Sequence, residues 1–197
     1  MSSPKKTTIT SGDILTSVLR WFDSEANLDS ITATDKKEVD WPRIVPLIFL
    51  QLMCLAVVWV GWSWTAVMVA LVLYLVRMFA ITGFYHRYFS HKAFKTPRFW
   101  QFIFGAVGNA SVQRGPLWWA AHHRHHHRFA DQPEDIHSPV HKGFLWSHML
   151  WILTPRYFAT DRQLVKDWLR FPELVFLNRF DILPPLGLLV LLLVFGR

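Results

Sequence analysis

The sequence predicts an all-α integral membrane protein, with a transmembrane helical hairpin, a cytoplasmic helical cap and the start of a third transmembrane helix. Three observations lead to this class. The chain is 52% hydrophobic, and two stretches of 21 residues with almost no charge follow one another. All ten histidines lie in the more polar segment behind them, between His86 and His148. We therefore expect an apolar anchor that carries a histidine-rich region.

The hairpin is predicted by residues 44–64, which carry no charge, and residues 65–85, which carry only Arg77. Each stretch matches the roughly 20 apolar residues with which a helix crosses the hydrocarbon core. The sequence Gly-Trp-Ser-Trp at residues 61–64 predicts a tight aromatic turn at the membrane interface. Buried soluble helices explain two such adjacent stretches less well. We expect a transmembrane hairpin over residues 43–85.

The charge distribution predicts the orientation of the hairpin. Residues 1–43 carry six Lys and Arg against seven Asp and Glu, whereas residues 86–179 carry thirteen against six, a net charge of +7. Basic residues flank the hairpin and none lies in its turn, so both flanks are expected in the cytoplasm. Residues 1–42 then form a polar tail and residues 86–180 the histidine-box region. The aromatic content favours a lipid surface over a nucleic-acid partner.

Two further apolar segments are shorter than a membrane span. Residues 99–112 predict a re-entrant or interfacial helix, in which Gly105 and Gly108 allow close packing under the histidine region. Residues 181–197 predict a truncated third transmembrane helix, because its apolar part, residues 182–195, has only 14 residues. The expected protein is therefore the N-terminal part of a longer one. The compact N-terminus favours a bacterial inner membrane.

The histidines form two groups. His86 and His91 lie in HRYFSH, and five more lie in HHRHHH, at His122, His123, His125, His126 and His127. Helix positions i, i+3 and i+4 share a face, so two registers are open: His123 with His126 and His127, or His122 with His125 and His126. His86 and His91 lie about 140° apart on an ideal helix and converge only if the helix ends or unwinds there.

Histidines at this density predict a metal site at the bilayer surface, since imidazole is the commonest nitrogen ligand of catalytic metals. Zinc hydrolases carry a Glu beside paired histidines, as in HExxH, and neither that Glu nor thiolate ligands are found in these motifs. Neutral nitrogen ligands with few carboxylates suit iron or another mid-row metal with open positions for oxygen.

The two groups also carry a resemblance. HRYFSH is an HxxxxH box and HRHHH at residues 123–127 is an HxxHH box, within the flanks ITGFYHRYFSHKAFKT, QRGPLWWAAHHRHHHRFAD and EDIHSP. The sequence resembles the membrane-bound fatty acid desaturase family, specifically the acyl-CoA Δ9 (stearoyl-CoA type) branch. The resemblance runs from about residue 41 to the C-terminus and is most specific over residues 77–151.

This resemblance implies a non-haem di-iron centre whose ligands, and catalytic residues, are His86, His91, His123, His126 and His127. It implies O2-dependent insertion of a cis double bond into an acyl-CoA or acyl-lipid, with electrons from a ferredoxin or a cytochrome b5. The family's third box and its Asn-x3-His element are not found in this chain. We therefore expect that these 197 residues alone do not assemble the complete centre.

The resemblance further implies a substrate region at Gln113, Arg114, Trp118 and Trp119. Arg114, Arg124 and Arg128 are expected to meet the phosphates of coenzyme A or of phospholipid head groups. Ala121 and His122 replace an Arg-Asp pair that contacts the head group in animal members. Two alternatives stay open, a related di-iron membrane hydroxylase and a non-catalytic metal-binding remnant.

Overall fold

The computed structural model describes residue 15, residues 18–26 and residues 41–196. Every regular element in this part of the chain is a helix, as expected for the all-α class. The predicted tail, residues 1–42, lies largely outside the described residues. The elements are α3 (Trp41–Met53), η1 (Cys54–Ala56), α4 (Val57–Val60), α5 (Trp64–Phe79), η2 (Ala80–Ser90), α6 (Arg98–Asn109), α7 (Pro116–Phe129), α8 (Pro139–Lys142), η3 (Trp146–Leu150), η4 (Trp151–Leu153), η5 (Pro155–Tyr157), α9 (Pro172–Arg179) and α10 (Leu183–Phe195).

Helices α5 and η2 form one continuous helix of 27 residues, which within the described chain is long and apolar enough to cross a membrane. Its start is fixed by Ser63, whose hydroxyl accepts a hydrogen bond from the N–H of Ala66. The predicted first arm of the hairpin is shorter than expected, since its apolar helix covers residues 44–60 and contains the 3-10 turn η1. The two-span hairpin therefore stays a prediction.

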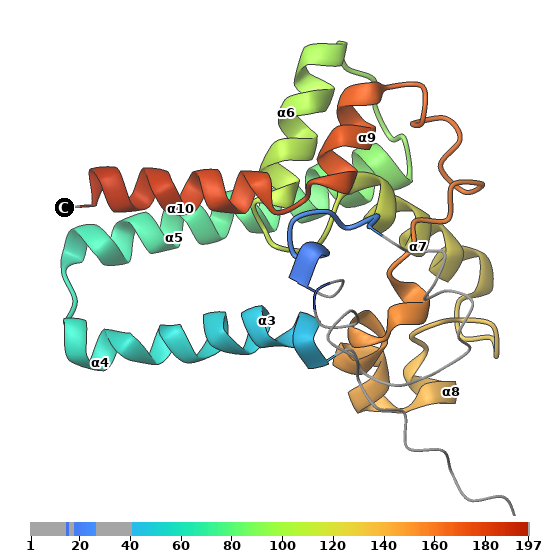
Figure 1. Cartoon of the computed structure of the whole chain (residues 1–197). Coiled ribbons are helices and arrows are strands. Elements are labelled where there is room, and N and C mark those ends of the chain that lie inside the picture. Colours follow the sequence, from blue (N-terminus) through green and yellow to red (C-terminus); the bar gives the residue numbers. More distant parts are fainter. Residues whose placement is uncertain (1–14, 16–17, 27–40, 197) are drawn as a thin grey trace, which may run out of the picture.

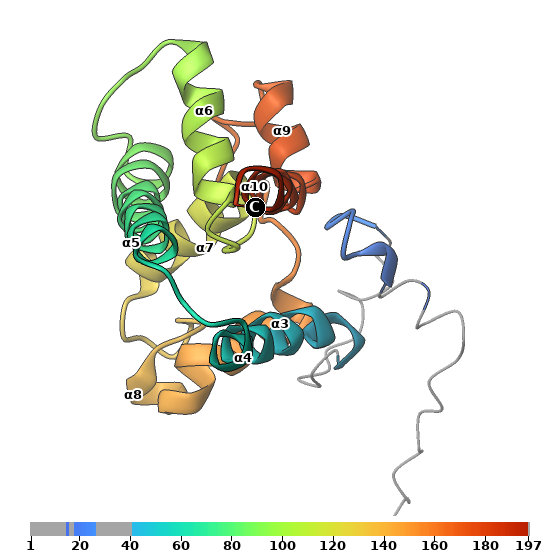
Figure 2. The ribbon, with the colours of Figure 1, turned by 90° about the vertical axis from the view of Figure 1, so that its left-hand side faces the viewer.

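Three apolar helices project to the same side of the histidine-bearing region. Figure 1 shows α3–α4 and α5 joined by a turn, with α10 extending in the same direction, and Figure 2 views them end on. Their side chains are open to the surroundings: Trp59 and Val60 are 82% and 84% exposed. Apolar surface on this scale suits lipid rather than water. Helix α10 is the expected third apolar helix. It is long enough to cross a membrane only together with α9, from which it is bent by 70°.

The core lies where η2 packs between α6 and α7, beside α9. Its buried side chains include Tyr85, Phe89, Leu117 and Leu174. A Cβ added at Gly108 of α6 would lie 2.0 Å from the Tyr85 ring, so the absence of a side chain is what lets this ring pack. The close packing expected at Gly108 is thereby confirmed. Tyr85 donates its hydroxyl hydrogen bond to Asn109, which in turn anchors α6 to α9 through the Leu177 carbonyl.

Candidate metal centre

The first histidine box lies on η2, whose π-helical hydrogen bonds join residue i to residue i+5. The N–H of His91 donates to the carbonyl of His86 at 3.2 Å, and the two imidazole rings lie 4.6 Å apart between centroids. The ideal α-helix would separate these rings. The expected unwinding at this point is therefore confirmed, and it takes the form of a π-helix.

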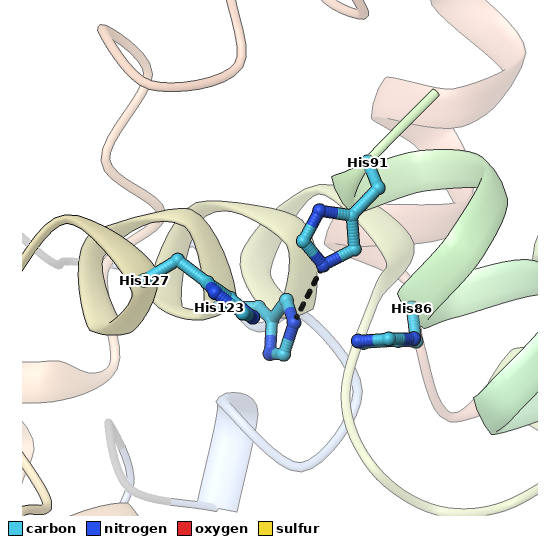
Figure 3. Close-up of side chains that lie close together, drawn as sticks. All are labelled: His86, His91, His123 and His127. Atoms are coloured by element: carbon cyan, nitrogen blue, oxygen red, sulfur yellow. Dashed lines mark hydrogen bonds between the residues drawn. The ribbon is translucent and has the colours of Figure 1, made fainter. Parts of the chain in front are cut away.

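The second box lies on α7, which begins with Pro116 at its first position. His123 and His127, four residues apart, face η2 and meet His86 and His91 there (Figure 3). One ligand nitrogen from each of the four residues lies within 4.8 Å of the others. We call these residues the four-histidine site.

The geometry of the four-histidine site fits a metal ion. Two nitrogens bonded to one metal at about 2.1 Å lie about 3.0 to 3.4 Å apart for octahedral or tetrahedral angles. The Nε2 atoms of His91 and His123 are 3.2 Å apart. Burial, reinforced by repulsion from neighbouring imidazoles, lowers the pKa of His123 to about 3, and the same causes lower the pKa of His91. Both rings therefore stay neutral at pH 7, which is the form that binds metals.

His126 does not join this site, although the sequence placed it on the same helix face. Its ligand atom lies within 4.8 Å of those of Asp135 and His137, and we call these three residues the Asp135 cluster. The separation follows from helix geometry: relative to His123, position i+3 leans about 60° to one side and position i+4 about 40° to the other. Adjacent residues of one box thus reach two different clusters.

Asp135 is fully buried and holds His126 by a hydrogen bond. Its carboxylate accepts from Nδ1 of His126 at 2.9 Å and from the backbone N–H groups of Asp131 and His137 at 3.2 Å. Since a carboxylate only accepts, Nδ1 of His126 carries the proton and Nε2 is left for a ligand. Sequence reasoning missed Asp135; the signal was a carboxylate two residues from a histidine in EDIHSP, just behind the second box.

An apolar cavity of about 550 Å³ adjoins the four-histidine site, and His123 lines it. Gln113, Trp118 and Trp119, expected near the substrate, line it as well. The ring of Trp119 stacks on His123 with centroids 4.7 Å apart, and its indole N–H donates to Gln113 at 3.3 Å. Trp118 is anchored by a 2.8 Å hydrogen bond to the Tyr157 carbonyl. The structure thus brings these three side chains together next to the four-histidine site.

Two of the three arginines expected to meet phosphates form hydrogen bonds inside the protein, whereas Arg128 is exposed. Arg114 also lines the cavity, but its guanidinium donates to Asp181 at 3.0 Å and to the Phe158 carbonyl at 3.2 Å. Arg124 donates to backbone carbonyls and to Asp167. Arg124 uses all of its donors in such bonds, so a phosphate role for this residue would require some of them to break. The two bonds of Arg114 leave other donors of its guanidinium for a ligand in the cavity.

Comparisons with known proteins show the family of this chain. Residues 37–196 match the family described as Fatty acid desaturase. The Delta-9 acyl-lipid desaturase 1 of Arabidopsis thaliana is 35% identical over 62% of this chain and 40% of its own length. The Acyl-CoA 5-desaturase AL21 of Anemone leveillei is 32% identical over 70% and 47%. The sn-1 stearoyl-lipid 9-desaturase of Anabaena variabilis is 32% identical over 85% and 62%.

The match covers only part of these relatives, because the chain spans between 40% and 62% of their length. No solved structure matches it. The family match nevertheless includes both histidine boxes and the long apolar helix, residues 64–90. The chain belongs to the fatty acid desaturase family.

Proposed function

We propose that the protein is an acyl-chain desaturase of the Δ9, stearoyl-CoA type. The observation that carries this proposal is the apolar cavity that adjoins the four-histidine site at His123. A saturated alkyl chain in this cavity has a vicinal pair of methylene groups beside the metal ligands. The reaction removes two hydrogen atoms from that pair. Together with two electrons and two protons from a donor, they reduce one O2 to two waters.

The metal in this proposal is non-haem iron. His86, His91, His123 and His127 would hold one ion, and His126, oriented by Asp135, would contribute to a second. Bound iron would supply the O2 activation that an unreactive C–H bond requires, a chemistry that side chains do not provide. A di-iron centre thus accounts for both clusters on α7.

The protein's own side chains position the alkyl chain and exclude water. Trp118 and Trp119 are rigid and fixed by hydrogen bonds, so they can hold one bent conformation of the chain against the site. The apolar lining keeps water from the reacting carbons. The relatives named above are an acyl-CoA desaturase and two acyl-lipid desaturases, so the acyl carrier is a separate question for experiment.

In the membrane, we place the hairpin at residues 43–85, the cap at residues 86–180 and a third apolar helix at residues 181–197. The cap faces the cytoplasm, where a ferredoxin or a cytochrome b5 can deliver electrons. The +7 charge of residues 86–179 supports this orientation and suits the anionic surface of a bacterial inner membrane.

The test is expression of the protein from its complete coding region in desaturase-deficient yeast, followed by mass spectrometry of the fatty acids. We expect monounsaturated products with a Δ9 double bond, absent in His123→Ala. They should be present in the control His141→Ala, because His141 is exposed and belongs to neither cluster. Feeding labelled acyl-CoA or labelled phospholipid to membranes identifies the carrier. A hydroxylated product would make the protein a hydroxylase instead, and bound metal without any product would support the non-catalytic alternative.

A further inference from the structure

We propose that Arg124 is a positioning residue that holds the two halves of the four-histidine site in register. The inference rests on the proposed function only in taking these histidines as metal ligands. Arg124 directly follows His123 on α7, but its side chain leaves the helix about 100° away from that ligand. It therefore reaches the neighbouring elements instead of the site itself.

The guanidinium of Arg124 uses all five of its N–H donors. Nε donates to the Ser90 carbonyl at 2.9 Å, and Nη2 donates to the Phe89 carbonyl at 2.7 Å. Nη1 donates to the Leu164 carbonyl at 2.6 Å. Nη1 and Nη2 also hold the two carboxylate oxygens of Asp167, at 2.8 and 3.1 Å. The side chain is only 19% exposed, so the fork is a closed internal clamp.

Two of these acceptors lie at the end of the helix that carries the first box. Phe89 and Ser90 are the last residues of η2, where a helix leaves carbonyl groups without partners of its own. His91 is the next residue, so its position depends on the hydrogen bonds that fix the C-terminal end of η2. Trp168 donates a further hydrogen bond to the Phe89 carbonyl at 2.8 Å. Arg124 thus links the helix of His123 to the helix end that sets His91.

Asp167 fixes the clamp from a third segment. Besides the bidentate pair with Arg124, its carboxylate binds Lys92 at 2.7 Å, one residue beyond His91. Burial alone would raise the pKa of Asp167, but the bonds from Arg124 and Lys92 outweigh it and lower that pKa. A lysine at position 124 would keep the charge but not the planar fork that binds several acceptors at once.

The test uses the full chain, the variants Arg124→Lys and Asp167→Asn, and the control Arg87→Lys. Arg87 is matched to Arg124 because it directly follows a ligand, His86, but it is exposed. Co2+ is the probe: its affinity is measured by chelator competition and its coordination by the visible absorption spectrum. Circular dichroism of the metal-free proteins reports whether each variant folds.

We expect Arg124→Lys to weaken Co2+ binding about 10- to 100-fold and to alter the spectrum, with helix content retained. Asp167→Asn, which keeps the carbonyl bonds of Arg124, should have a smaller effect, and Arg87→Lys none. Affinity and spectrum equal to wild type in Arg124→Lys would overturn the proposal, as would a wild-type chain that binds no Co2+. If Arg124→Lys does not fold, an unaltered Co2+ spectrum in Asp167→Asn overturns it instead.

These results are independent of turnover. If the wild-type enzyme desaturates and Arg124→Lys binds Co2+ normally, only the positioning role of Arg124 is refuted. If Co2+ binding depends on Arg124 but no unsaturated product forms, only the proposed desaturase function is refuted. A general loss of stability would lower the unfolding temperature without changing the spectrum of the Co2+ that still binds.

Discussion

The two histidine clusters of α7 differ in how they are built. The four-histidine site joins residues 32 or more positions apart, and its candidate ligand atoms are all imidazole nitrogens. The Asp135 cluster is local, spanning residues 126–137, and contains a buried carboxylate that already accepts hydrogen bonds. The long-range cluster depends on the packing of η2 against α7, whereas the local one depends on the loop behind α7.

Because of this difference, neighbouring histidines of the second box are oriented by different parts of the protein. His126 is oriented directly by Asp135, which acts within its own loop. His91 and His123 have no such carboxylate in the four-histidine site, so their relative position must come from the elements that carry them. The two clusters should therefore respond to different substitutions.

The largest effect is expected from removing a ligand of the four-histidine site. His123→Ala deletes one of four ligand nitrogens and the ring on which Trp119 stacks, so Co2+ affinity should fall by more than about 100-fold. His126→Ala is the matched control and should leave the affinity of this site within about threefold. Equal losses in both variants, measured by chelator competition, would show that the two clusters bind metal as one unit.

Next in size is the loss of the carboxylate in the other cluster. Asp135→Ala leaves the Nδ1 of His126 and two partly buried backbone N–H groups without their acceptor, which should cost about 3 kcal/mol of stability. The thermal unfolding temperature should fall accordingly. Affinity of Co2+ for the four-histidine site should change little, and a large loss there would contradict the independence of the two clusters.

A smaller effect is expected where packing supports the long-range cluster. Gly108→Ala places a methyl group against Tyr85, the residue before His86, and should cost about 1 to 3 kcal/mol. It should also weaken metal binding at the four-histidine site, because η2 must shift. Gly187→Ala is the control, since nothing lies within 4 Å of its added Cβ. Unchanged unfolding temperature and Co2+ affinity in Gly108→Ala would argue against this tight packing.

A pH-dependent effect of similar size is expected from His122, which packs on Trp118 and directly precedes His123. Burial lowers its pKa to about 4, so the folded protein keeps it neutral while the unfolded chain takes up a proton below about pH 6.5. Its contribution to stability is therefore present at pH 7 and is lost as pH falls toward 4. Between pH 7 and pH 5, wild type should lose about 2 kcal/mol more than His122→Phe. An equal loss of unfolding free energy between pH 7 and pH 5 in wild type and His122→Phe would refute this prediction.

Much of the fold could be predicted because its signals are local. The apolar stretch of residues 65–85, the turn at residues 61–64 and the close packing at Gly108 all follow from side-chain type and spacing. Composition does not reveal where the helix of the first arm ends: it stops after Val60, because Gly61 adopts a positive φ. Sequence spacing could not show the internal partners of Arg114 and Arg124, because those partners lie 34 or more residues away along the chain.

The sequence by itself determined that histidines, and not thiolates or paired carboxylates, would form the site, and which helices would carry them. Only the tertiary structure decided which of those histidines belong to the four-histidine site and which belong to the Asp135 cluster. A helical period groups His123, His126 and His127 on one face, but a ligand set is fixed by what lies opposite each ring. The π-helical end of η2 places His86 and His91 opposite His123 and His127. The buried carboxylate of Asp135 binds His126 on another side of α7.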